Sequence, residues 1–221
     1  KDVSFNVKKG EILGLFGLMG AGRTNIIEAI YGVRKISSGE VLLKGEPVTI
    51  DSPESAMKYG IAYLPAERKL EGLLLDHPVS ENIVLASIDK RLGTVKLHLQ
   101  KEKEIAHKWV KELNIKTPSI STEVQTLSGG NQQKVVLAKA LEVEPEIILL
   151  NEPTRGIDVG AKIEIYKLIE SLCEQGKAVI MISSEIPEIM GIADRIVVVC
   201  EGRVTGELTR EEFDSDAMMN L

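Results

Sequence analysis

The stretch GLMGAGRT, at residues 17–24, decides how the rest of the chain is interpreted. It follows an apolar run at residues 11–16 and precedes residues 24–31, where isoleucines recur at helical spacing. Glycines in such a loop let backbone N–H groups turn towards one point at a helix start, where the helix dipole also favours negative charge. We therefore predict a phosphate site here, rather than a glycine turn without a ligand.

The spacing of this stretch matches the P-loop motif at every position except that Arg23 stands where lysine is usual. The hydroxyl of Thr24 is placed to ligate Mg²⁺. Arg23 keeps the positive charge, but its planar guanidinium is bulkier than an ammonium on a flexible stem. The motif therefore predicts nucleotide binding and leaves hydrolysis open. The predicted nucleotide contacts are Gly17, Leu18, Met19, Gly20, Ala21, Gly22, Arg23, Thr24 and Asn25.

Composition limits the functions that remain. The chain has 221 residues, of which 27 are basic and 33 acidic, so its net charge is -6. An acidic chain has little general attraction for a nucleic-acid backbone, so we do not expect nucleic acid as a partner. No apolar run approaches the roughly 20 residues that a membrane-spanning helix needs. Cys173 and Cys200 lack a CxxC spacing, so we expect buried free thiols and a reducing compartment.

The pattern along the chain predicts an α/β fold. After residue 127, predicted helices and strands alternate, which is typical of a parallel sheet flanked by helices. Residues 39–50 indicate two short antiparallel strands, and residues 80–126 a helical region with Trp109 in its core. The predicted strands are 2–7, 11–16, 39–43, 47–50, 61–64, 147–150, 178–182 and 195–199, and the longer predicted helices are 24–31, 132–143 and 160–174.

We expect two parts in this fold. A nucleotide-binding core with the antiparallel β region would comprise residues 1–79 and 127–221, and a helical subdomain residues 80–126. The chain begins without methionine in an alternating apolar pattern, so we expect it to start within a sheet as a piece of a longer protein.

Two further segments carry chemistry. Residues 127–133, LSGGNQQ, bring a serine hydroxyl, backbone N–H groups and a dipole end to one helix start, which favours a second anion site; the alternative is a plain N-cap. Residues 147–152, IILLNE, place Glu152 at the end of a buried strand, where it is a candidate general base. The alternative for Glu152 is a salt bridge at the edge of the sheet.

Together these blocks resemble the ATP-binding cassette (ABC) family. With PTRGIDVGAK at 153–162 and SSEIPE at 183–188, they look like the second, C-terminal cassette of bacterial ribose, galactose, xylose and arabinose import ATPases. The resemblance runs from residue 1 to about residue 208. It implies the ABC ATPase fold of P-loop NTPases, with a mixed or parallel core sheet, an antiparallel β region and an inserted helical subdomain.

The resemblance also implies roles for single residues. In the family, a turn called the signature, which LSGG at 127–130 resembles, meets the γ-phosphate held by the partner cassette. The catalytic glutamate follows the buried Walker B strand, which IILL at 147–150 resembles. The D-loop aspartate works across the dimer interface. For the aspartate, an N-cap of the following helix is the alternative. These roles fall on Ser128, Gly129, Gly130 and Gln132 for the signature, Glu152 for catalysis and Asp158 for the D-loop.

Several positions depart from the common family pattern. Ala66 falls where the Q-loop glutamine is usual, and alanine cannot ligate Mg²⁺. Ser184 replaces the switch histidine and is too short to substitute for an imidazole. Asn151 replaces the Walker B aspartate and removes a charge that helps to order Mg²⁺. The arginine and the serine are usual in the sugar-import subgroup, whereas Asn151 is not. An aromatic residue that stacks on adenine lies before Val3 in the family.

Two functional hypotheses follow from the resemblance. The first is a domain that binds ATP and Mg²⁺ and couples ATP hydrolysis to sugar import. The second is a degenerate cassette that binds nucleotide and completes the partner's site without hydrolysis. Both imply a second cassette in the same full-length polypeptide and membrane permease subunits as partners. Both also imply a periplasmic or extracellular sugar-binding protein that acts indirectly, and a peripheral place on the cytoplasmic face of the membrane. A cassette of DNA repair or translation would show a zinc-ligand insertion or a basic arm, and the sequence has neither.

Overall fold

The computed structural model describes residues 3–88 and 99–221. Its contacts divide the chain into two units. Unit 1 comprises Lys1–Tyr63, Glu146–Glu152 and Ile169–Leu221, and unit 2 comprises Leu64–Pro145 and Pro153–Leu168.

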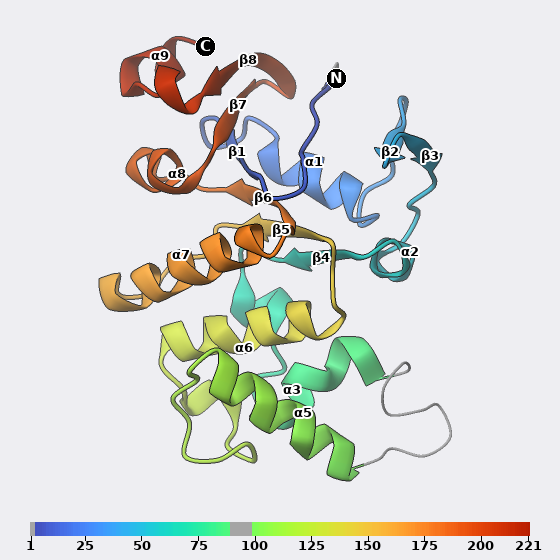
Figure 1. Cartoon of the computed structure of the whole chain (residues 1–221), viewed down its shortest axis with the longest axis vertical. Coiled ribbons are helices and arrows are strands. Elements are labelled where there is room, and N and C mark those ends of the chain that lie inside the picture. The colour runs from blue at the N-terminus through green and yellow to red at the C-terminus, as the bar shows by residue number, and fades with distance from the viewer. Residues whose placement is uncertain (1–2, 89–98) are drawn as a thin grey trace. The chain divides into compact units, whose positions relative to one another are not determined.

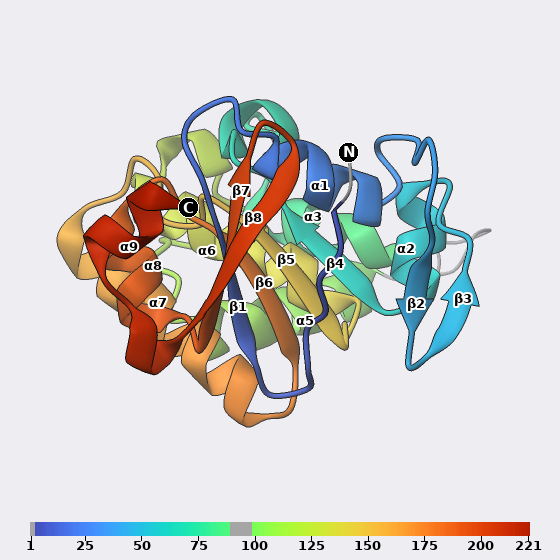
Figure 2. The same cartoon turned by 90° about the horizontal axis from the view of Figure 1, so that it is seen from above.

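A six-stranded sheet is the main feature of unit 1, with the strand order β4-β5-β6-β1-β7-β8 (Figures 1 and 2). β5, β6, β1 and β7 pair in parallel, whereas β8 pairs antiparallel with β7. All residues of β1 and β6 are buried, which explains why these strands are continuous apolar runs. The strands are β1 Ile12–Phe16, β4 Ile61–Leu64, β5 Ile147–Asn151, β6 Ala178–Ile182, β7 Arg195–Cys200 and β8 Arg203–Thr209.

The helices of unit 1 are anchored on this sheet by apolar side chains. Ile27 of α1 belongs to the same buried cluster as Leu13, Leu15 and Leu149 of the strands, so the start of α1 has a fixed place after β1. The other elements are α2 Pro53–Lys58, α8 Ile186–Ile192, η4 Arg210–Glu212, α9 Ser215–Asn220 and the hairpin of β2 Val41–Leu43 with β3 Glu46–Val48, while α1 is Arg23–Ile30.

Unit 2 is helical. α3 contacts both α5 and α6, and the three helices lie together in Figure 1. Trp109 of α5 is buried and donates a hydrogen bond from Nε1 to Glu142 Oε2 of α6 at 2.5 Å, which confirms its predicted core position. The elements are the π-helix η1 Arg68–Gly72, α3 Val79–Val84, η2 Leu85–Ser87, α5 Leu99–Glu112, η3 Val124–Thr126 and α6 Gly129–Glu142; α7 Val159–Glu174 begins in this unit and ends in unit 1.

Most predicted elements are confirmed, but three details are wrong. Residues 3–7 alternate in burial as a strand does, yet their backbone pairs with no strand in the described part of the chain, and residue 2 lies outside it. α6 begins at Gly129, three residues earlier than predicted, because both signature glycines adopt helical geometry. The sequence patterns also missed three elements, the helices α2 and α9 and the strand β8.

The thiols were also expected to be buried, and neither is. Both cysteines are free, but Cys173 is half-buried and Cys200 is exposed. Cys200 is the last residue of β7, where the buried run of residues 196–199 ends. Part of the predicted helical region, residues 89–98, lies outside the described residues. Across residues 3–88 and 99–221, no helix combines the length and apolarity needed to cross a membrane.

Candidate functional site

The loop at residues 17–22 has the backbone that an anion site needs. Gly20 and Gly22 have φ values of 87° and 99°, which glycine adopts at little cost. Gly17 lies tightly against β7, because a Cβ atom there would be 2.1 Å from the carbonyl oxygen of Val199. α1 begins directly after Gly22, so its unpaired N–H groups open onto the loop. Of the predicted contacts, Leu18, Met19, Gly20 and Asn25 are exposed, Gly22 and Thr24 are half-buried, and Gly17, Ala21 and Arg23 are buried.

Arg23 directs its side chain into unit 1. Its Nη1 donates a hydrogen bond to the carbonyl oxygen of Ser183 at 2.9 Å, and its Nη2 donates one to Oγ of Ser184 at 3.2 Å. Burial lowers the pKa of the guanidinium, and the nearby Glu152 carboxylate opposes that change. A guanidinium has five N–H donors, so part of this set is already used within the protein before any phosphate arrives.

Glu152 follows β5 in a backbone conformation that residues other than glycine rarely adopt, with φ of 51°. Its N–H donates to the carbonyl oxygen of Ile182 at 2.9 Å, which ties this turn to β6. Ser184 donates to both carboxylate oxygens, from its N–H to Oε2 at 3.1 Å and from its hydroxyl to Oε1 at 2.5 Å. Arg23 Nη1 lies 4.0 Å from Oε1, so the ion pair predicted as the alternative is present.

Asn151 ends β5 and is 1% exposed. Its Nδ2 donates to Thr24 Oγ1 at 3.4 Å and to the hydroxyl of Tyr63 at 3.3 Å. Its Oδ1 is buried and has no hydrogen-bond partner among the residues that the structure describes. Buried acceptors are nearly always paired, so this oxygen beside Thr24 is a candidate ligand for a group that the chain does not supply.

In unit 2, Ser128 precedes α6, and Gly129 and Gly130 form the first turn of that helix. Within the described chain the Ser128 hydroxyl does not cap its own helix; it accepts a hydrogen bond from Asn131 Nδ2 at 2.9 Å. Asn131 is itself held, because its Oδ1 accepts from the N–H of Lys116 at 2.8 Å. The hydroxyl of Ser128 is therefore held by Asn131 at an exposed helix start and does not bond to the backbone of the helix.

Two other predicted residues of unit 2 have structural roles. Gln132 is buried and donates from Nε2 to the carbonyl oxygen of Val124 at 3.2 Å, so its side chain supports the turn before the signature rather than lying beside the exposed Ser128. Asp158 Oδ1 accepts from the N–H of Ala161 at 3.0 Å, which is the N-cap arrangement weighed as its alternative.

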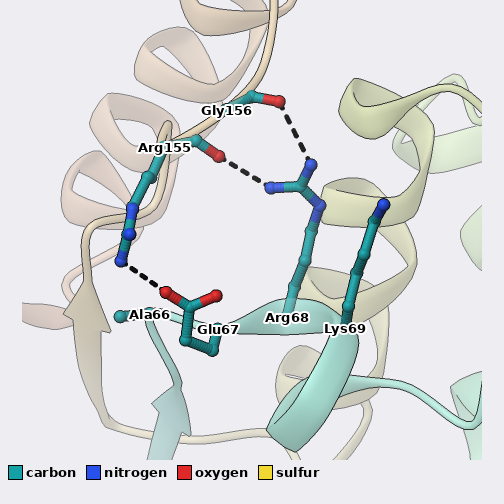
Figure 3. Close-up of a pocket in the computed structure, with 6 residues that line it drawn as sticks. All are labelled: Ala66, Glu67, Arg68, Lys69, Arg155 and Gly156. Carbon is teal, nitrogen blue, oxygen red and sulfur yellow. Dashed lines mark hydrogen bonds and ion pairs between the residues drawn. The ribbon is translucent and has the colours of Figure 1, made fainter.

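A pocket in unit 2 places Ala66 near the turn at residues 153–158, which holds the predicted D-loop residue Asp158 (Figure 3). Arg68 Nη1 donates to the carbonyl oxygen of Arg155 at 2.7 Å, and Nη2 donates to that of Gly156 at 3.1 Å. Ala66 adds a methyl group to the lining and no side-chain donor or acceptor. The pocket is lined by Ala66, Glu67, Arg68, Lys69, Arg155 and Gly156.

The structure thus brings together the predicted residues in two groups. In unit 1, the first group consists of Arg23, Thr24, Asn151, Glu152 and Ser184. In unit 2, the second group lies at the turns of residues 128–130 and 153–158 and consists of Ala66, Ser128, Gly129, Gly130 and Asp158.

Sequence patterns missed three residues that contact these groups. Tyr63 and Arg68 meet partners 88 and 87 positions further along the chain, and no local spacing reveals such contacts. Asn131 was within reach of prediction, because an amide one turn after Ser128 is a suitable partner for its hydroxyl.

The comparisons with known proteins agree with this geometry. The profile of the family described as "ABC transporter" matches residues 1–155. The xylose import ATP-binding protein XylG of Moorella thermoacetica is 51% identical over 220 residues, which are 99% of this chain and 44% of that protein. The ribose import ATP-binding protein RbsA of Clostridium perfringens is 49% identical and covers 100% of this chain, again with 44% of its own length. The chain therefore spans less than half the length of these relatives.

Solved structures confirm the predicted fold class. A dimeric ATP-binding cassette in a post-hydrolysis state, bound to ADP and Pi, has a TM-score of 0.81 at 27% identity and covers 96% of this chain and 91% of its own. A nucleotide-free cassette from an ABC transporter has a TM-score of 0.82 at 22% identity, covering 99% and 88% of the two chains, and supports the fold alone. The family profile matches most of this chain, and the relatives named above are about 50% identical to it. The chain therefore belongs to the ABC transporter ATP-binding family.

Proposed function

We propose that this chain is the second of two nucleotide-binding cassettes in a bacterial monosaccharide importer. It binds ATP at residues 17–25, couples ATP hydrolysis to import, and gives Ser128, Gly129 and Gly130 to the ATP held by the other cassette. Its partners are the first cassette, in the same polypeptide, and membrane permease subunits on the cytoplasmic face of the membrane. A sugar-binding protein outside the membrane acts indirectly. The proposal retains a core at residues 1–79 and 127–221 and a helical subdomain at 80–126.

The observation that carries this proposal is the glycine loop at the start of α1. Positive φ values at Gly20 and Gly22 turn backbone N–H groups towards the space before the helix, and phosphate is the ligand that this arrangement suits. The transport role rests on the names of the relatives, which are xylose and ribose import ATP-binding proteins.

The residues beside the loop suit Mg²⁺ as part of the ligand. The Thr24 hydroxyl and the unpaired Oδ1 of Asn151 are neighbouring oxygen donors, and Mg²⁺ prefers oxygen ligands. Both would hold the ion directly or through its water shell. When bound, Mg²⁺ would neutralise part of the phosphate charge.

The second candidate function is a cassette that binds nucleotide without hydrolysing it. The observation in its favour is that both oxygens of Glu152 accept hydrogen bonds from Ser184, which leaves fewer lone pairs for an attacking water. Ala66 does not replace the polar side chain of the usual Q-loop glutamine, and Asn151 does not replace the charge of the usual Walker B aspartate. In this candidate the chain would contribute to turnover only through its signature turn.

Replacing Gly20 by glutamate tests nucleotide binding. A side chain at Gly20 meets no atom within 4 Å, so the fold has room for it, but it places a negative charge in the anion site. We expect affinity for labelled ATP to fall about 30-fold, equivalent to about 2 kcal/mol, since two like charges about 4 Å apart repel by about 1 kcal/mol in bulk water and about 4 kcal/mol near a protein surface. Fluorescence titration of the purified chain measures this effect.

Gly45→Glu is the matched control. Gly45 has φ of 86°, against 87° at Gly20, and it too meets no atom within 4 Å. Both variants therefore carry the same backbone strain of about 1–2 kcal/mol, while Gly45 lies in the β2–β3 turn. The proposal predicts equal loss of stability and loss of ATP binding in Gly20→Glu alone; equal affinity of the two variants would contradict it.

A further inference from the structure

Arg68 makes contacts that neither the family match nor the proposed function explains. It is the first residue of η1, a π-helix, and such helices are rare and often occur at functional positions. Its guanidinium donates to two successive carbonyl oxygens of the D-loop turn, those of Arg155 and Gly156, in the two-pronged manner that Figure 3 shows. Arginine can bridge two acceptors in this way because its donors form a planar fork.

The same guanidinium borders the signature turn. A Cβ atom at Gly129 would lie 2.9 Å from Arg68 Nη2 and 3.1 Å from the carbonyl oxygen of Gly156. Position 129 therefore has little room for a side chain, because this guanidinium and this carbonyl occupy the space beside it. Arg68, Gly129 and Gly156 form one contact group, which we call the D-loop clamp.

The other end of η1 is tied to the middle of the signature helix. Lys139 of α6 donates from Nζ to the carbonyl oxygen of Gly72, the last residue of η1. A Cβ atom at Gly72 would lie 3.2 Å from Val136 of α6, so the two elements are in close contact. Lys139 is half-buried, and burial lowers the pKa of its ammonium. η1 thus has one end on the D-loop turn and the other on α6.

The clamp is not the arrangement that stability alone would favour. Arg68 Nε is buried and has no hydrogen-bond partner in the part of the chain that the structure describes. Burial also lowers the pKa of this guanidinium, with the Glu67 charge opposing the change. An unpaired buried donor destabilises the folded chain, and such departures are expected where a functional geometry is kept.

We propose that Arg68 is a positioning residue that holds the D-loop turn and the signature turn at a fixed spacing, so that both reach the partner cassette's ATP together. The inference rests on the proposed function, which gives the signature turn to the partner's site. Arg68 itself touches no nucleotide in this scheme.

The test compares three variants in the complete two-cassette protein. Arg68→Met removes both hydrogen bonds, and Arg68→Lys keeps the charge but replaces the fork by a single ammonium. Lys69→Met is the matched control, because Lys69 is the next cation of η1 and has no hydrogen bond or ion pair within residues 3–88 and 99–221. Should Arg68→Met fail to fold, the lysine variant decides the question.

The first readout is amide hydrogen exchange. We expect exchange to rise at least about fivefold in both the 153–158 and 128–131 segments of Arg68→Lys, since both segments lose the guanidinium that lies against them. Lys69→Met should match the parent. Unchanged exchange in Arg68→Lys, or a rise in one segment alone, would show that Arg68 does not join the two turns.

The second readout is ATP turnover. We expect kcat to fall about tenfold in Arg68→Lys with KM for ATP unchanged, because misplaced groups near the reaction centre slow the chemistry. A faster exchange with an unchanged kcat would overturn the positioning role. The proposed function is judged separately by the signature variant Gly130→Ala: if that variant loses turnover while Arg68→Lys does not, the inference about Arg68 fails and the proposed function stands.

Discussion

Replacing Gly130 by alanine in the complete two-cassette protein should lower ATP turnover by at least about 100-fold, while ATP binding at residues 17–25 persists. Gly130 is buried in the first turn of α6, and a Cβ atom there would lie 2.6 Å from Cβ of Ala161 in α7. Non-bonded Cβ atoms essentially never approach within 3.0 Å, so α6 and α7 have to move apart at this point. This movement changes the position of Ser128 and its N–H neighbours relative to α7, and the proposed function places these groups against the partner's γ-phosphate.

Steady-state phosphate release measures this effect, with labelled-ATP titration as the test of binding. Gly191→Ala is the control, because Gly191 also lies in a helix but a Cβ atom there meets nothing within 4 Å. That variant should keep full turnover and gain slightly in stability, since alanine favours a helix by about 0.5–1 kcal/mol over glycine. If Gly130→Ala keeps more than half of the parent's turnover, the signature turn of this chain does not serve the partner's site.

The fold was largely predictable because its strongest signals are local. β1, β5 and β6 are runs of buried apolar residues, and the glycine loop lies between a strand and a helix as a phosphate site requires. The strand β8 was missed for the opposite reason. Its residues alternate between exposed and half-buried along the edge of the sheet, so no apolar run marks it, and it is defined by antiparallel pairing with β7.

The chemistry of the site was less predictable, because it depends on contacts between distant residues. The sequence predicted a bulkier, planar cation at Arg23 and a missing imidazole at Ser184, but not that these two side chains would form a hydrogen bond across 161 positions. Nor did it predict that Ser184 would donate to both oxygens of Glu152. Motifs give the residue types at a site, whereas the partners of each donor and acceptor follow from the packing of strands that are far apart in sequence.

A substitution at Asn151 tests whether this chain is an ATPase or a cassette that binds nucleotide without hydrolysing it. Asn151→Asp restores a carboxylate next to Thr24 and Tyr63, whose hydroxyls can rotate to donate to it. In the ligand-free chain this charge is buried, so we expect the midpoint of thermal unfolding to fall. With Mg²⁺ and ATP the same charge is compensated, and apparent affinity for Mg-ATP should rise about tenfold, equivalent to about 1.4 kcal/mol.

The readouts are thermal unfolding and ATP titration, each with and without Mg²⁺. Asn151→Leu is the control, since its side chain branches at the same atom and supplies no oxygen, and it should show a smaller dependence on Mg²⁺ than the parent. The idea that residue 151 helps to hold the metal fails if Asn151→Asp responds to Mg²⁺ no more than the parent does, because a buried oxygen next to a metal ligand must respond to gaining a charge.

Phosphate release by the same variant decides between the two functions. A Mg²⁺-dependent gain of at least about tenfold would mean that Glu152 can still activate water when the metal is well held, despite its hydrogen bonds to Ser184. Tighter Mg-ATP binding without any gain in turnover would mean that Ser184 and Arg23 keep Glu152 from the reaction. In that case the chain is a cassette that binds nucleotide without hydrolysing it, and hydrolysis belongs to the site that its signature turn completes.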